Sequence, residues 1–176
     1  MALNWFNGNK TPYVDVCRSG LITGLTLNTP PEAIYRALIE SMGFETLSIM
    51  KHMEASGTAL KKIYCCGGAA EKNPLLMQIF SEILQHRLYV VTSGQTAALG
   101  AAIYAAVAAG SKHGGYDDVK TASDCMKFSS HTVYHPRIQA EQIYKQLYPL
   151  FLQLGSTFAP ARQDIMKNLK EIQQSI

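Results

Sequence analysis

The sequence predicts an α/β fold in which short strands alternate with helices, and three observations support this. Residues 63–66 form an apolar, β-prone run suited to a strand buried on both faces, and two glycines follow it directly. Apolar residues then repeat at helical spacing over 75–84. A second β-prone run at 87–91 and an alanine-rich stretch at 95–109 repeat the order of strand and then helix.

The two glycines mark the point at which the first strand turns toward a helix. Because they lack a Cβ atom, Gly67 and Gly68 permit a sharp turn and the close approach of a flat ligand to the backbone. Asn73 is suited to cap the next helix and Pro74 to begin it. A helix start presents free N–H groups to an anion or nucleotide. The turn therefore indicates either a nucleotide-binding site or a turn that only packs the helix against the strand. The residues alone do not decide between these two interpretations.

The segment before this unit is predicted to contain turns, a strand and a long helix. Residues 1–19 are rich in turn formers, and Trp5 and Phe6 are expected to anchor them in a core or interface. Residues 21–27 alternate in the manner of a strand.

The long helix is expected to run from about Thr29 to about Ala55. Thr29 is predicted to be its N-cap, with Glu32 completing a capping box. Glu40 and Glu45 lie on this helix and are candidate functional carboxylates, although a helical glutamate is more often simply solvated.

Beyond the alanine-rich helix, the sequence predicts a short helix over 117–125 and an extended segment over 127–136. His131 and His135 are four residues apart, but the extended segment has no carboxylate or cysteine at ligand spacing, so no metal site is expected. Two amphipathic helices follow, which are expected to pair as an antiparallel hairpin around Gly155.

The composition limits the class of protein. Of 176 residues, 47% are hydrophobic and 16% are charged, which is typical of a folded domain. The net charge of +3 and the scattered lysines provide no basic stripe, so nucleic acid is not an expected partner. No apolar run would span a bilayer and no signal peptide is visible, so no membrane association is expected. The four cysteines lack a CxxC pair, which fits a reducing cytoplasm: Cys17, Cys65, Cys66 and Cys125.

The motifs of a self-sufficient catalytic site are absent from the sequence. It has no GxSxG, HExxH or GxxxxGK[ST] motif. The candidate aspartates fall in loops or peripheral helices, away from the glycine turn in sequence: Asp15, Asp117, Asp118, Asp124 and Asp164. A nucleotide bound at the turn would therefore lack a visible catalytic base.

Four blocks in order resemble the C-terminal half of FGGY-type carbohydrate kinases: residues 21–26, 35–40, 67–79 and 98–102. Residues 3–12 and the lysine-rich tail are similar to ribulokinases in particular. The chain departs from the family pattern at Ala33, where a polar residue is common, and at Leu38, where a smaller or β-branched residue is common.

This resemblance implies an actin-like, ribonuclease-H-like ATPase domain that is incomplete and carries a C-terminal helical extension. It implies a partial nucleotide-binding domain over 1–136, with its core at 20–110, and a helical hairpin over 137–176 packed on it. The implied reaction uses ATP and Mg²⁺ to phosphorylate a ketopentose such as L-ribulose in cytoplasmic arabinose catabolism. The residues that the resemblance places beside the adenosine are Gly67, Gly68, Ala69, Lys72 and Asn73.

The same resemblance implies that no catalytic residue is present in this chain. The family's catalytic aspartate, sugar-binding residues and phosphate-binding Gly-Thr turn are expected upstream of Met1, so the chain is expected to be an inactive fragment. Its implied partners are an adenine nucleotide, the missing N-terminal domain and, through exposed apolar surface, further copies of itself. The alternative is a non-catalytic actin-like module for interaction or assembly that responds to adenine nucleotide.

Overall fold

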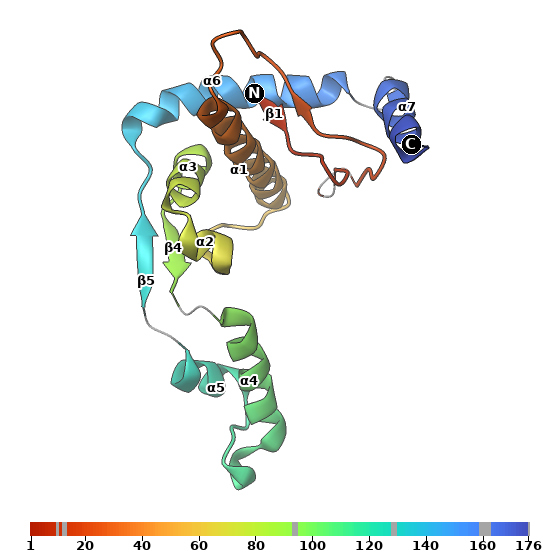
Figure 1. Ribbon diagram of the computed structural model, residues 1–176. Helices are drawn as coiled ribbons and strands as arrows, with labels where there is room; N and C mark the ends of the chain where they lie inside the picture. Colours follow the sequence, from red (N-terminus) through yellow and green to blue (C-terminus); the bar gives the residue numbers. More distant parts are fainter. Residues whose placement is uncertain (10, 12–13, 93–94, 128–129, 159–162, 176) are drawn as a thin grey trace. The chain divides into compact units, whose positions relative to one another are not determined.

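The computed structural model describes residues 1–9, 11, 14–92, 95–127, 130–158 and 163–175. The chain forms two compact units, which are described separately (Figure 1). The first unit comprises Met1–Lys61, Gln78–His86 and His135–Ile176. The second comprises Lys62–Met77 and Arg87–Tyr134.

The first unit is mainly helical and carries a small antiparallel pair of strands. The strands pair with Ala2 opposite Ile22 and Leu3 opposite Leu21. The long helix α1 contacts β1 and α6. The elements of this unit are β1 (Ala2–Leu3), β2 (Leu21–Ile22), α1 (Pro31–Ala55), most of α3 (Pro74–Leu84), α6 (Ile138–Thr157) and α7 (Gln163–Gln174).

Phe44 is the centre of the core between α1 and α6. Its side chain is almost fully buried, at 1% exposure. The rings of Tyr144, Tyr148 and Phe151 from α6 lie 6.0, 6.0 and 5.2 Å from its ring centroid. Aromatic pairs at these distances add stabilisation beyond the burial of their area, so this cluster fixes α6 against α1.

Within the same unit, α3 meets α1 where α1 has a glycine. A Cβ atom at Gly43 would lie 2.6 Å from Cδ1 of Ile83, so only glycine admits this side chain without a shift. The carboxylate of Glu82, which is fully buried, forms an ion pair with Arg137 and accepts a hydrogen bond from Gln78 at 2.9 Å. These contacts tie α3 to the start of α6.

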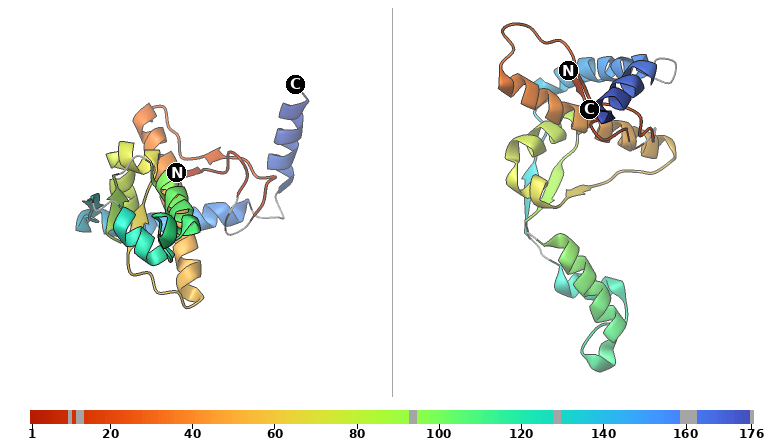
Figure 2. Two further views of the ribbon diagram at one scale, coloured as in Figure 1. Left: turned by 90° about the horizontal axis from the view of Figure 1, so that it is seen from below. Right: turned by 45° about the vertical axis from the view of Figure 1, so that its right-hand side comes forward.

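The second unit contains a three-stranded sheet in the order β3–β4–β5. β3 and β4 are parallel, with Ile63 opposite Leu88, and β5 runs antiparallel to β4. The helix α2 lies beside β4, and α5 and η1 pack against α4 (Figure 2). The elements of this unit are β3 (Ile63–Cys65), α2 (Gly68–Lys72), β4 (Leu88–Val91), α4 (Thr96–Ala109), η1 (Ser111–His113), α5 (Val119–Met126) and β5 (His131–Tyr134).

Several local predictions were wrong in the N-terminal part of the chain. The strand expected over 21–27 is only two residues long. Thr29 does not cap α1, because its hydroxyl accepts a hydrogen bond from the Thr26 amide and the helix begins after Pro30. Trp5 is buried as expected, whereas the Phe6 ring is 65% exposed and lies over Gly20.

Two further predictions were wrong elsewhere. The strand β3 is not buried on both faces, since Tyr64 is exposed and Cys66 lies beyond the strand end in an exposed position. Gly155 lies inside α6 and does not form a turn, because α6 continues to Thr157. No helix in the described part of the chain has both the length and the apolar character needed to cross a bilayer.

Substitution of Phe44 tests the importance of the aromatic cluster. We expect Phe44→Ala to lower the free energy of unfolding by about 3–5 kcal/mol, because a buried ring is lost and a cavity remains. Met42→Ala on the same helix is the control, since Met42 is 42% exposed. Denaturant unfolding of both variants measures the difference. Equal losses in the two variants would contradict a central role for Phe44.

Candidate functional site

The glycine turn leaves the carboxyl end of β3 and leads directly into α2. Gly67 has φ 96°, in the region that favours glycine, and its carbonyl accepts a hydrogen bond from the Glu71 amide at 3.1 Å. A Cβ atom added at Gly67 or Gly68 would meet no other heavy atom of the described residues within 4 Å. The backbone of this turn is therefore open to a ligand.

The five residues predicted to contact nucleotide lie within the short segment 67–73, in which Ala70 is buried. Gly68, Ala69 and Lys72 are exposed on α2, and Gly67 and Asn73 are half-buried at its two ends. The Asn73 carboxamide oxygen accepts a hydrogen bond from the Leu76 amide at 3.0 Å, so it caps α3 as predicted. Nucleotide contact by these residues stays a prediction.

The sequence prediction did not include the helix α2. It occupies the five residues between Gly67 and Asn73, where a simple turn was expected. The run Ala69-Ala70-Glu71 contains good helix formers and could have signalled it. The five residues of α2 make slightly more than one helical turn, so the two glycines and Asn73 lie at opposite ends of this helix.

Glu45 is engaged in the core of the first unit. Its carboxylate accepts a hydrogen bond from the indole nitrogen of Trp5 at 2.7 Å. Burial raises the pKa of the Glu45 carboxyl above its ordinary value, although the hydrogen bonds from Trp5 and Asn4 act in the opposite direction. This contact anchors the N-terminal segment on α1.

Glu40 joins α1 to α6 through a small polar network. Arg36 pairs with Glu40 at 2.8 Å and also donates to the Tyr144 hydroxyl at 2.9 Å. That hydroxyl donates to Glu40 at 3.1 Å. Burial and the nearby Glu40 carboxylate raise the pKa of Tyr144 to about 12, so Tyr144 stays protonated.

The candidate aspartates have structural partners or lie outside the described side chains. Asp15 pairs with Arg18 at 3.0 Å, and Asp124 pairs with Lys127 at 2.6 Å. The Asp164 side chain is outside the described residues. Hydrogen bonds from Ser111 lower the pKa of Asp117. Hydrogen bonds from Thr121 lower the pKa of Asp118, which is the N-cap of α5.

The described residues contain no group of three histidine, cysteine or acidic side chains placed to hold a metal ion. His131 lies on β5, as the extended prediction required. All four cysteines are free, and burial raises the pKa of the Cys65 thiol. The glycine turn is therefore the part of the predicted site that the geometry leaves open to a ligand.

Comparison with known sequences identifies relatives over nearly the whole chain. Residues 1–109 match the profile of the FGGY family of carbohydrate kinases, C-terminal domain. The ribulokinase of Halalkalibacterium halodurans is 41% identical over 172 residues, which are 98% of this chain and 31% of that protein. The ribulokinase of Anoxybacillus flavithermus is 41% identical over 170 residues. The chain thus spans about a third of the length of these curated relatives.

Solved structures agree with this match. A xylulose kinase from Rhodospirillum rubrum superposes with a TM-score of 0.71 at 26% identity, over 92% of this chain and 31% of that one. A kinase from Brucella ovis, described as a xyloylose kinase, has the same fold with a TM-score of 0.77 at 21% identity, over 90% and 32% of the two chains. The matches confirm the predicted fold class and the resemblance drawn from the sequence.

The pH dependence of stability tests the environment of Glu45. The unfolded chain loses this proton near the ordinary pKa of 4.5, and the folded chain holds it to higher pH, so the fold loses relative stability as pH rises through this window. We expect Glu45→Gln to gain stability relative to the unchanged chain as the pH rises above the ordinary pKa of 4.5. Unfolding curves at several pH values measure this.

The control for that experiment is Glu32→Gln, at an exposed position on the same helix. It should show no comparable gain. A constant difference between Glu45→Gln and the unchanged chain at every pH would show that Glu45 titrates alike in the folded and unfolded states.

Proposed function

This chain belongs to the FGGY family of carbohydrate kinases, and we propose that it is the nucleotide-binding portion of a ribulokinase-like enzyme. In that enzyme the γ-phosphate of ATP is transferred to L-ribulose, giving ADP and ribulose 5-phosphate. The observation that carries the proposal is the open backbone at Gly67 and Gly68 in a chain that matches this family. The remaining two-thirds of the relatives' length supplies the other wall of the site.

The proposed roles of the five site residues follow from their positions. Gly67 and Gly68 admit the flat face of adenosine because no Cβ atom stands in the way. The small side chain of Ala69 leaves room for the ligand at the start of α2. The exposed Lys72 adds positive charge on the same helix. Asn73 lies at the far end of α2, where its side chain is oriented by the cap of α3.

Mg²⁺ is proposed to bind together with the phosphates of ATP. When bound, the ion neutralises charge on the transferring phosphoryl group. The ion is proposed to be held by the phosphates together with residues of the remaining two-thirds of the enzyme.

The proposed domain organisation retains a partial actin-like domain over 1–136, with its core at 20–110. The helical extension over 137–176 packs on that domain, which is supported by the contacts of α6 with α1 and β1. The proposed setting is cytoplasmic arabinose catabolism, and the four free cysteines fit a reducing compartment.

An enzymatic assay tests whether the 176-residue chain alone catalyses phosphoryl transfer. Phosphoryl transfer depends on a carboxylate that orients the attacking hydroxyl and on a complete phosphate cradle. The 176-residue chain is therefore expected to show no ATP-dependent phosphorylation of L-ribulose above a blank without protein. A full-length ribulokinase is the positive control, and clear turnover by the chain alone would contradict the proposal.

Binding of ADP tests the glycine turn directly. With one wall missing, we expect weak binding, with a roughly millimolar dissociation constant, seen by saturation-transfer NMR on the ligand. Gly68→Leu should abolish it, because the backbone there is outside the left-handed region and the new side chain would fill the open space. Ala55→Leu, at the exposed last residue of α1, is the matched control. Equal binding by both variants would contradict the proposed site.

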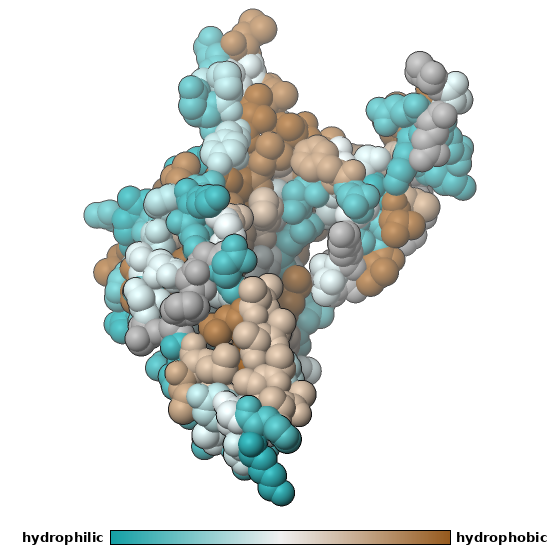
Figure 3. Space-filling model, turned by 60° about the horizontal axis from the view of Figure 1, so that its bottom comes forward, coloured by the Kyte–Doolittle hydropathy of each residue, from teal (hydrophilic) through white to brown (hydrophobic). Residues whose placement is uncertain are grey.

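A second proposal, favoured by the surface of α4, is a non-catalytic module that self-associates in response to adenine nucleotide. None of the residues of α4 is buried, and Tyr104 is 67% exposed. Figure 3 shows a light brown, apolar area over α4. Apolar surface of this kind favours association, and the proposed partner is a second copy of the chain.

Sedimentation velocity distinguishes this second proposal. We expect concentration-dependent association of the unchanged chain and a shift to monomer in Tyr104→Lys, because a charge is placed within the apolar surface. Tyr35→Lys, at a half-exposed site on α1, is the control. A chain that is monomeric at all concentrations, with and without ADP, would exclude the assembly module.

A further inference from the structure

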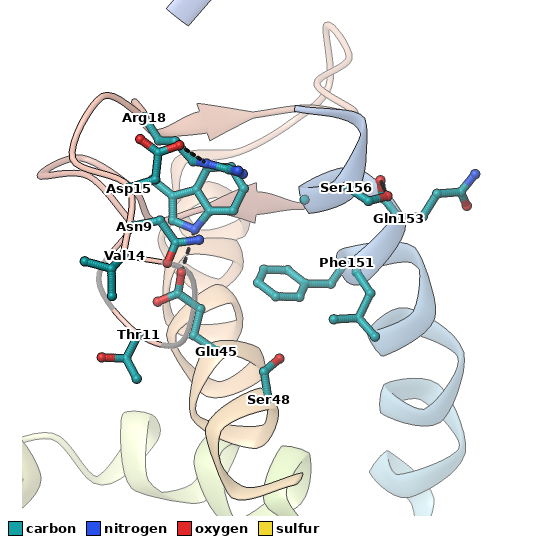
Figure 4. A pocket seen from close by; sticks show the side chains of 13 residues that line it. Asn9, Thr11, Val14, Asp15, Arg18, Glu45, Ser48, Phe151, Gln153 and Ser156 are labelled. Atoms are coloured by element: carbon teal, nitrogen blue, oxygen red, sulfur yellow. Dashed lines mark hydrogen bonds and ion pairs between the residues drawn. The ribbon is translucent and has the colours of Figure 1, made fainter. Parts of the chain in front are cut away.

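A cavity of about 760 Å³ lies in the first unit, formed entirely by residues of that unit. Its walls come from the N-terminal loop, α1 and α6 (Figure 4). Sites for small organic molecules typically measure roughly 300–1,000 Å³ and are lined mainly by apolar side chains with a few polar groups. This cavity fits that description, and the proposed kinase function assigns it no role.

The apolar part of the cavity is made by buried aromatic side chains. Trp5 and Phe151 line it and are only 4% and 5% exposed. Figure 4 shows the Phe151 ring pointing from α6 into the space that Glu45 faces from α1. Rings in such positions bind another ring or a branched apolar group well, because stacking adds to area burial.

The charged groups of the cavity favour a cation. Asp15 and Arg18 pair with each other at 3.0 Å, and the Arg18 guanidinium lies over the Trp5 ring at 4.8 Å. Glu45 remains, and no cationic side chain of the described residues lies within salt-bridge distance of it. A half-buried carboxylate with no cationic partner among the described residues is stabilised by an ammonium group, which offsets its loss of hydration.

We propose that this cavity binds a small organic ammonium ion carrying an aromatic or branched apolar group. The ammonium lies at the Glu45 carboxylate, and the apolar group packs against Trp5 and Phe151. The Trp5 indole nitrogen keeps its hydrogen bond to the same carboxylate and orients it toward the ligand.

Phosphorylated ligands do not suit this cavity. Asp15 and Arg18 neutralise each other, so Glu45 is the one described lining residue that adds unbalanced charge, and that charge is negative. A nucleotide or sugar phosphate would be repelled. The ammonium site is therefore separate from the proposed nucleotide site, and failure of one leaves the other untouched.

Fluorescence titration with 2-phenylethylamine tests the proposal on the full chain. Trp5 is the one tryptophan of the 176 residues, so its emission reports on this cavity. We expect a saturable change with 2-phenylethylamine, weaker binding of the uncharged 2-phenylethanol, and no binding of the anionic 3-phenylpropanoate.

Two variants separate a specific site from a general solvent effect. Glu45→Gln keeps a hydrogen-bond acceptor for Trp5 but removes the charge, and should weaken 2-phenylethylamine binding about tenfold or more. Ser156→Phe adds a ring at an exposed position of the cavity wall and should abolish binding by filling the space. Asp124→Asn, at an exposed carboxylate paired with Lys127, should leave the affinity unchanged. Circular dichroism establishes that each variant is folded.

Three results would overturn the proposal. The first is the absence of a saturable Trp5 response to 2-phenylethylamine. The second is equally tight binding of the alcohol or the carboxylate probe, which would remove the need for a cation. The third is unchanged affinity in a folded Glu45→Gln or Ser156→Phe variant.

Discussion

The parallel pairing of β3 with β4 is the constraint on which the candidate site depends. Two consecutive parallel strands need a crossover connection, which must leave the carboxyl end of the first strand and return to the start of the second. Here the connection is α2 followed by α3, and Gly67 makes the first change of direction with a positive φ. The strand order therefore explains why the chain changes direction at Gly67 and Gly68. Ligands of open α/β sheets bind at this edge, beyond the carboxyl ends of the strands.

The first unit has a different organisation, because its stability comes from aromatic packing between α1 and α6. Phe44 and the three rings around it form the buried centre. Polar contacts surround that centre, including the hydrogen bond between Trp5 and Glu45. Trp5 holds the N-terminal loop on α1, and the space left between this loop and α6 becomes the cavity. The same contact thus fixes a chain segment and shapes a binding surface.

Much of the second unit could be predicted from local sequence signals. Asn73 and Pro74 predicted the start of α3, because capping and proline rules act over a few residues. The short helix predicted over 117–125 corresponds to α5. The contact of Trp5 with Glu45 could not be predicted, since the two residues are 40 positions apart. The cavity was missed for the same reason, because its lining comes from three separated segments. Thr29 misled the prediction because its hydroxyl stabilises a turn with Thr26.

The location of bound ADP on the chain tests most directly whether the glycine turn binds nucleotide. Amide ¹H–¹⁵N correlation spectra, recorded during an ADP titration, give that location residue by residue. We expect the largest shift changes at Gly67, Gly68 and the neighbouring amides of α2. Changes confined to the first unit, or no change at the two glycine amides while ADP binds, would contradict this expectation.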